Sequence, residues 1–260
     1  MSRRAGCRAL VTMVAALLGA IFLSGSDQPV TAHSSYPHWQ VLPAPPLAPR
    51  THALGVPVGH RVLVLGGLGS GTTEHARRDG ATYDLTSGVW HRVLVPVPVT
   101  DRDSAVDAAG VVVLRHRRVG RPPTWWRYDV RQAMWSRMYD VPRRLSPPSA
   151  FGSEVYAMSG RRVVVYSIQL RRWTPFPRDP HRPVLVRPTV TASRAGTVVL
   201  GHTPGHRHRV FADRWDGLRW HRTRAEAAPL VIAPSDGATR VRVGGRTLVV
   251  RGDSAWIRLP

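Results

Sequence analysis

The chain of 260 residues contains no lysine and no asparagine, so all 37 of its lysine or arginine positions are arginine. Acidic residues are few, 16 in all, and the formal net charge is +21 at pH 7. Such a basic balance favours an anionic partner. Arginine also has G/C-rich codons, whereas lysine and asparagine have A/T-rich ones, so a G/C-rich genome would give the same bias without a selected partner. Both explanations stay open at this point.

Cysteine occurs once, at Cys7, inside a segment with the layout of a secretory signal. Residues 1–32 begin with arginines, continue with 15 mostly apolar residues from Ala9 to Leu23, and end in a small-residue cleavage pattern. An uncleaved N-terminal anchor is the alternative, although a membrane span needs about 20 residues. Cleavage would leave a chain without thiols, which excludes disulfides, thiolate metal sites and a cysteine nucleophile.

Sustained helical periodicity and further long apolar runs are both lacking after residue 32. Glycine and proline number 23 each, which implies many turns and disfavours long helices. Short β-prone runs between turn residues indicate an all-β chain. We expect a short linker at residues 33–38 and one all-β domain at residues 39–260.

The strongest pattern that is present is an internal repeat. Tryptophans recur at steps of 36 to 51 residues, at Trp39, Trp90, Trp135, Trp173, Trp220 and Trp256. A large residue stands seven positions before four of them, namely Tyr83, Tyr128, Tyr166 and Val249. In the fourth unit Trp215 stands five positions before its tryptophan. Each pair predicts two strands joined by a tight turn.

A further β-prone run precedes each of these hairpins and predicts another strand. The runs are Val62 to Leu65, Val111 to Leu114, Val155 to Met158, Thr197 to Leu200 and Val241 to Val243. Three or four antiparallel strands per unit, repeated at this period, predict a β-propeller of small sheets around an axis.

The first unit resembles a kelch repeat. Pro49-Arg50-Thr51-His52-Ala53, the doublet Gly66-Gly67, Tyr83-Asp84 and Trp90 match the family's pattern. The resemblance implies a kelch-repeat β-propeller of the galactose-oxidase central-domain superfamily, in which the doublet ends the second strand and the aromatic residues pack between blades. Later units depart from the pattern, and the second has Arg115-His116 in place of the doublet.

The number of blades depends on how the sixth tryptophan strand, at Trp39, is used. In kelch propellers an N-terminal strand often completes the last blade, but we expect residues 256–260 to fill that place here. The sequence therefore predicts about five kelch-like blades and an extra strand. A six-bladed ring with one incomplete blade is the alternative.

Candidate catalytic groups are scarce. Copper radical oxidases among the kelch-like propellers need a cysteine, which the mature chain would lack, so we expect no cofactor. A carbohydrate-active enzyme would need two carboxylates near the central channel, and Glu154 at the head of a predicted strand is a candidate. His206 and His208 share one face if extended, but no third ligand stands at a diagnostic spacing, so we expect no metal.

The best candidate for ligand contact is a strand with two neighbouring tryptophans. Alternation places Trp125 and Arg127 on one face. We expect this face, together with Arg118 and Arg121, to present aromatic and arginine groups to a glycan or an anionic polymer. The alternative is that both faces of the strand pack between blades.

The expected function is that of an exported binding module, secreted or held at the cell surface or in the periplasm. Its partner is expected to be an anionic polymer, a glycan or a protein, and a carbohydrate-active enzyme is the alternative. The sequence carries no recognised nucleic-acid motif, and export argues against such a target. Membrane contact is expected only through an uncleaved N-terminal segment.

Overall fold

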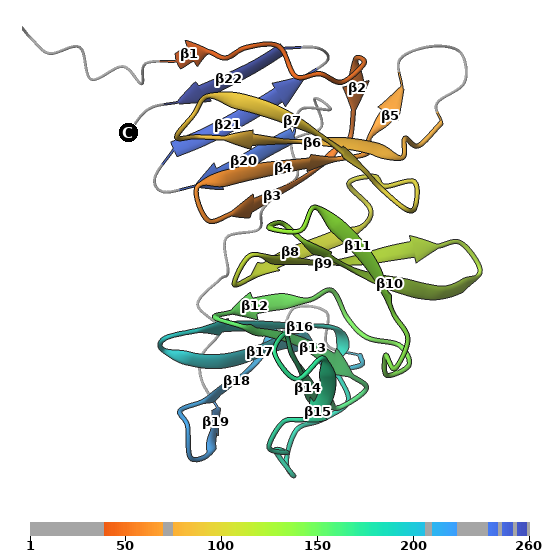
Figure 1. The fold of residues 1–260 in the computed structure, drawn as a ribbon. Coiled ribbons are helices and arrows are strands. Elements are labelled where there is room, and N and C mark those ends of the chain that lie inside the picture. Colours follow the sequence, from red (N-terminus) through yellow and green to blue (C-terminus); the bar gives the residue numbers. More distant parts are fainter. Residues whose placement is uncertain are drawn as a thin grey trace, which may run out of the picture. The chain divides into compact units, whose positions relative to one another are not determined.

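All regular secondary structure in the described part of the chain is β-strand, which confirms the predicted all-β class (Figure 1). The computed structural model describes residues 39–69, 75–205, 210–222, 239–243, 246–251 and 254–258. The predicted signal peptide at residues 1–32 and linker at residues 33–38 lie outside these ranges. Within the ranges, no helix is long and apolar enough to cross a membrane.

Five antiparallel sheets of four strands form the described fold. Sheet 1 contains β3 (Leu54–Val58), β4 (Arg61–Leu65), β6 (Asp79–Asp84) and β7 (Val89–Leu94). Sheet 2 contains β8 (Ser104–Ala108), β9 (Val111–Arg118), β10 (Arg121–Asp129) and β11 (Met134–Met138). Sheet 3 contains β12 (Ser149–Phe151), β13 (Glu154–Ser159), β14 (Arg162–Ser167) and β15 (Arg172–Pro175).

The two remaining four-stranded sheets come from the C-terminal part of the chain. Sheet 4 contains β16 (Val186–Ser193), β17 (Gly196–His202), β18 (Val210–Trp215) and β19 (Trp220–Arg222). Sheet 5 contains β20 (Thr239–Val243), β21 (Arg246–Arg251), β22 (Ser254–Arg258) and β1 (Trp39–Val41). A small extra sheet pairs β2 (Arg50–Thr51) with β5 (Leu68–Gly69).

The N-terminal strand β1 completes sheet 5, which corrects the expected use of the last tryptophan. Val41 pairs with Trp256 and Trp39 with Arg258, so β22 is the third strand of the sheet and β1 is the fourth. Likewise the run from Val241 to Val243 belongs to the first strand, not the second. The repeat was misaligned here because Trp256 occupies the place that tyrosine holds in earlier hairpins. No unpaired extra strand remains in the described sheet.

The aromatic hairpins repeat in geometry as well as in sequence. The third and fourth strands of sheets 1 to 3 pair tyrosine directly with tryptophan, at Tyr83–Trp90, Tyr128–Trp135 and Tyr166–Trp173. The ring centroids of these pairs lie 4.8, 4.8 and 5.3 Å apart. Sheet 4 substitutes Trp215–Trp220, with centroids 5.6 Å apart. Tilted contacts of this kind add to the free energy gained by burying the rings.

Each of the first three hairpins also needs a left-handed residue five positions after its tyrosine. The φ angle is +71° at Gly88, +52° at Ala133 and +54° at Arg171. Glycine adopts this backbone without steric cost, whereas a residue with a Cβ is strained there. The second and third hairpins therefore keep the same turn geometry although they have no glycine at this position.

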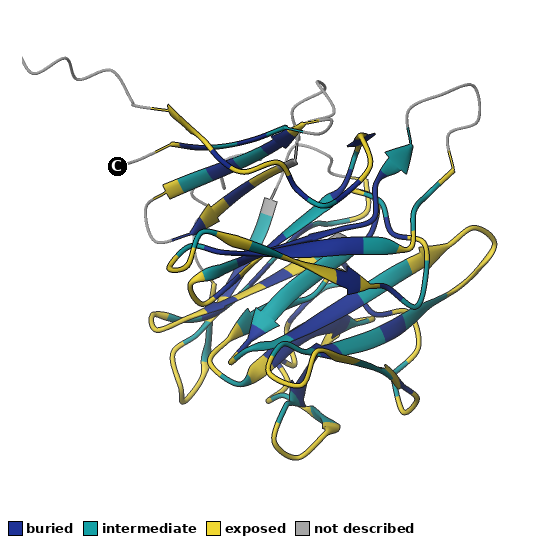
Figure 2. Cartoon of the chain, turned by 45° about the horizontal axis from the view of Figure 1, so that its top comes forward, coloured by how far each residue is buried: buried dark blue, intermediate teal, exposed yellow. Residues whose placement is uncertain are grey.

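Neighbouring sheets pack face to face, in a propeller-like arrangement. In β4, Val62 and Val64 pack toward sheet 5, while Leu63 and Leu65 pack toward sheet 2. A strand buried on both faces reads as a continuous apolar run. Contacts between first strands link β20 to β3, β3 to β8, β8 to β12 and β12 to β16. Figure 2 shows the buried residues in the strands and most exposed ones in the turns.

Candidate functional site

An arginine-rich surface follows the third and fourth strands of sheet 2 toward sheet 3. We call it the arginine strip and define it by five residues from β10, β11, the link to sheet 3 and the β14–β15 turn: Arg127, Arg137, Arg143, Arg144 and Arg171. Two adjoining pockets, of about 160 and 190 Å³, are lined by these arginines and share residues 137–139.

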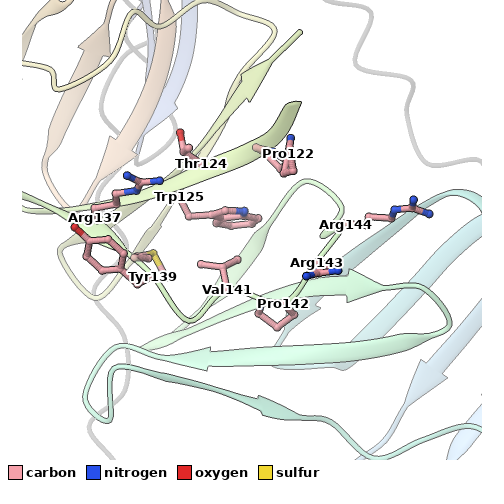
Figure 3. Close-up of a pocket in the computed structure, with 11 residues that line it drawn as sticks. Pro122, Thr124, Trp125, Arg137, Tyr139, Val141, Pro142, Arg143 and Arg144 are labelled. Carbon is pink, nitrogen blue, oxygen red and sulfur yellow. The ribbon is translucent and has the colours of Figure 1, made fainter. Parts of the chain in front are cut away.

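The first pocket has an apolar middle with arginines on both sides (Figure 3). In the close-up Trp125 lies above Val141, Arg137 lies on one side, and Arg143 and Arg144 lie on the other. None of the eleven residues that line this pocket carries a carboxylate. An anionic group inside it would therefore meet positive charge without a competing acid.

Trp125 is not the exposed platform that the sequence predicted. Its side chain is 2% exposed, and its ring packs edge-on against that of Trp173 in sheet 3, with centroids 5.6 Å apart. On the opposite face of β10, Trp126 and Tyr128 join the apolar cluster with sheet 1. A sheet with a neighbour on each side buries both faces of its strands. Trp125 consequently lines the first pocket as a buried side chain and does not present an exposed ring.

The second pocket contains Arg127, whose Nε donates a hydrogen bond to Oγ of Ser136 at 2.6 Å. On the wall shared with the first pocket, the guanidinium carbon of Arg137 lies 5.4 Å from the ring centroid of Tyr139. Asp140 is the one carboxylate among the residues lining the two pockets. Within the described ranges, no arginine of the strip forms an ion pair with a carboxylate.

Arg118 and Arg121 lie elsewhere, at the exposed end of the β9–β10 hairpin, where they are directly paired. Like charges opposite each other on a ladder are destabilising. Arg118 lines a third pocket, and Arg121 lines none of the three. The four predicted ligand-binding residues therefore do not form one site, since Trp125 and Arg127 line the two pockets of the strip and Arg118 lines the third pocket.

The third pocket, which we call the His–Asp cleft, has a volume of about 770 Å³. It lies between loops of sheet 1 and the adjacent ends of β8 and β9. Its charged and titratable lining consists of two histidines, two aspartates and three arginines: His52, His116, Asp101, Asp103, Arg102, Arg117 and Arg118. Of these residues, the sequence singled out only Arg118 as a binding residue.

The doublet Gly66-Gly67 brings the loops of this cleft together. Both glycines have positive φ, +59° and +101°. A Cβ on Gly66 would lie 2.1 Å from the carbonyl oxygen of Val99, and one on Gly67 would lie 2.7 Å from that of Thr51. Only glycine permits such an approach. The sequence predicted the doublet as a strand end, and its close packing against residues 51 and 99 is an additional role.

Each histidine of the cleft is held by an aspartate. Nδ1 of His52 lies 2.7 Å from Oδ2 of Asp101, and Nδ1 of His116 lies 3.2 Å from Oδ1 of Asp103. The Asp103 side chain is 3% exposed and also accepts the backbone N–H groups of Thr100 and Arg117. Asp103 thus holds the loop in place and orients the imidazole of His116. Sequence reasoning missed both pairs.

Carboxylates do not converge on the first strands. In the described ranges, β3, β8, β12, β16 and β20 carry a single one, Asp107, whose pKa is raised by burial and whose Oδ1 accepts the N–H of Gly110. Glu154 begins β13, which is a second strand, and accepts a hydrogen bond from the hydroxyl of Tyr156. Glu154, the carboxylate candidate for the alternative enzyme, therefore does not lie on a first strand beside a second acid.

The described residues contain no group of three histidine, cysteine, aspartate or glutamate side chains able to hold a metal ion. His206 and His208, the weak metal candidates, lie outside the described ranges. Their geometry accordingly stays a prediction.

No protein-family model matches the chain, and a search of curated proteins gives no match. The fold assignment therefore rests on strand order and pairing, and the functional argument rests on the arginine strip and the His–Asp cleft.

Proposed function

We propose that the chain is an exported, kelch-like β-propeller that binds an anionic polymer at the cell surface through the arginine strip. The observation that carries this proposal is the charge balance of the two adjoining pockets, where five arginines meet one carboxylate and none is ion-paired. Anionic groups of a polymer would supply the missing counter-charge.

Pocket size favours a polymer over a small ligand. A water molecule takes about 30 Å³ in the liquid, and small-molecule sites span roughly 300–1,000 Å³. Volumes of about 160 and 190 Å³ suit one anionic group each, with its hydration water. Two such pockets side by side fit successive charged groups along a chain. The exposed ring of Tyr139 provides apolar surface for its uncharged part.

The kelch assignment and export are part of the same proposal. The glycine doublet, the paired aromatic hairpins and the N-terminal strand in the last sheet support a kelch-type propeller. The signal-like segment at residues 1–32 supports export. The alternative, a carbohydrate-active enzyme, lacks a pair of free carboxylates among the described residues that line these sites. N-terminal sequencing of secreted protein should begin at His33.

The binding proposal is tested with heparin as the anionic probe and two double variants. Arg137→Gln with Arg143→Gln removes two charges from the strip, and Arg92→Gln with Arg194→Gln removes two exposed charges elsewhere. The strip variant should lose about tenfold in affinity, and its log–log salt slope should shrink by about two. The control should change much less in both quantities, because its arginines contact no pocket of the strip.

Equal losses in the two variants would contradict the proposal and leave only generic attraction between a basic protein and a polyanion. Binding that disappears at moderate salt for every polyanion, with no difference between the variants, would do the same. Thermal unfolding of both variants checks that the comparison concerns folded protein.

A further inference from the structure

The His–Asp cleft is a second charged site, separate from the arginine strip and about four times larger than either strip pocket. Its lining brings guanidinium and imidazole groups to one cavity from two sheets. The strip contains no histidine, so its affinity for anions has no built-in dependence on imidazole protonation. The cleft differs in this respect.

The carboxylate partners fix which nitrogen of each imidazole carries the proton in the neutral ring. An ionised carboxylate only accepts hydrogen bonds, so Nδ1 of His52 and of His116 must carry the proton. Nε2 is then a bare acceptor in the neutral ring and becomes an N–H donor when the ring is protonated. In the neutral ring, the lone pair on Nε2 repels an oxyanion. After acidification, Nε2–H of both rings can donate a hydrogen bond to an oxyanion.

The backbone at His52 is in the left-handed region, as it is at four other non-glycine residues among those described. Its φ is +54°, a left-handed conformation that few residues other than glycine adopt. The backbone N–H of Asp101 donates to the His52 carbonyl at 2.8 Å, and the carboxylate of the same aspartate holds the ring. Strain that the surroundings enforce in this way clusters at binding and catalytic sites.

The remaining charges of the cleft favour an anion. Arg102, Arg117 and Arg118 are exposed and have no ion pair within the described ranges, and they line the same cleft as Asp101 and Asp103. Among the described residues of the lining, three guanidinium groups against two carboxylates give a charge of +1 while the imidazoles are neutral. Protonation of both rings raises this charge to +3.

We propose that the His–Asp cleft binds a tetrahedral oxyanion, the phosphate or sulfate group of an ester, and that it binds this group more tightly at acid pH. The arginines attract the dianion, and the protonated imidazoles donate Nε2–H to its oxygens. The site is distinct from the arginine strip, so it adds a second, pH-dependent mode of binding to the proposed function.

The test uses inorganic sulfate, which stays a dianion from pH 5.5 to 7.5, so any pH dependence comes from the protein. Calorimetry at constant ionic strength should give a dissociation constant at least about tenfold lower at pH 5.5 than at pH 7.5. Proton NMR should show sulfate moving the Hε1 resonances of His52 and His116 toward their protonated positions.

The variants His52→Asn and His116→Gln remove the two rings, and asparagine tolerates the left-handed backbone. The double variant should bind sulfate weakly and equally at both pH values. The matched control is His221→Gln, because Nε2 of this histidine lies 2.5 Å from Asp216 in an exposed turn outside the cleft. The control should keep the wild-type pH response.

A pH response that survives in the double variant, or that is lost equally in the control, would overturn the proposal. If the double variant fails to fold, the wild-type NMR titration decides, and resonances of the two histidines that ignore sulfate would overturn it. Methyl phosphate and methyl sulfate at pH 7.5 then distinguish the two ester types. The strip variant Arg137→Gln with Arg143→Gln should keep the full pH dependence of sulfate binding, which separates this proposal from the polymer-binding one.

Discussion

The buried arginines of this protein and the arginines of its strip differ in what neutralises them. Arg50 is 3% exposed and Arg182 is 1% exposed, and each forms an ion pair with an aspartate. The strip arginines have no such partner within the described ranges. The few carboxylates neutralise buried arginines and hold turns, so the excess positive charge is left at the surface, where an anion can approach it.

Arg182 lies in the link between sheets 3 and 4 and shows how fully a buried arginine is engaged. Its Nε donates to Oδ2 of Asp213 at 3.2 Å, and its guanidinium carbon lies 4.1 Å from the ring centroid of Trp220. Burial, together with a hydrogen bond to Asp179, raises the pKa of Asp213 to about 6. These groups are mutually dependent, so removing one leaves another buried without its partner.

The largest effect expected from this comparison is on stability. Arg182→Ala should lower the free energy of unfolding by about 3–5 kcal/mol, because it leaves buried carboxylates without their cation. Arg143→Ala, at an exposed strip position, should change it by no more than about 0.5 kcal/mol. Urea unfolding measures both, and similar losses in the two variants would erase the distinction between buried and strip arginines.

A smaller effect is expected in the pH dependence of stability. Because the pKa of Asp213 in the fold, about 6, exceeds its ordinary value of 3.8, the stability from this proton is full below about pH 4 and is lost as pH rises through 6. Asp213→Asn has no such proton. Its stability relative to wild type should improve by on the order of 2 kcal/mol between pH 4 and 7. Parallel pH profiles for the two proteins would refute this origin.

The smallest of the three effects concerns geometry rather than charge. Two guanidinium nitrogens of Arg50 donate hydrogen bonds to the carboxylate of Asp79, at 2.8 and 2.9 Å. Arg50 also donates to the carbonyl of Gly66. Lysine keeps the charge but not the planar fork, so Arg50→Lys should cost about 1–2 kcal/mol. Chemical denaturation checks this, and a loss as large as that of Arg182→Ala would contradict it, because the planar fork would then matter as much as the charge.

Much of the fold could be predicted because propeller-like sheets repeat locally. The second strands of sheets 1 to 4 and their aromatic hairpins depend on apolar runs, turn residues and spacing, which are visible along the chain. The role of β1 was missed because its pairing with β22 joins the two ends of the domain. Trp256 carries no local sign that it belongs to a third strand.

The candidate sites were harder to predict, since both depend on contacts between sheets. Alternation along the strand placed Trp125 and Arg127 on one face. It could not show that a neighbouring sheet packs against this face and buries the tryptophan. The partners His52 and Asp101 are 49 positions apart and meet only because glycines let their loops approach. The one available signal was the Gly66-Gly67 doublet, which marks a close backbone approach but does not name the partners.

The most direct test of the central claim is to map which arginines a bound polyanion covers. Phenylglyoxal modification with and without heparin, followed by peptide mass spectrometry, reports this residue by residue. The account predicts strong protection at Arg137, Arg143 and Arg144 and little at Arg92 and Arg194. Equal protection of all five would contradict it, because the strip would then be no different from the rest of a basic surface.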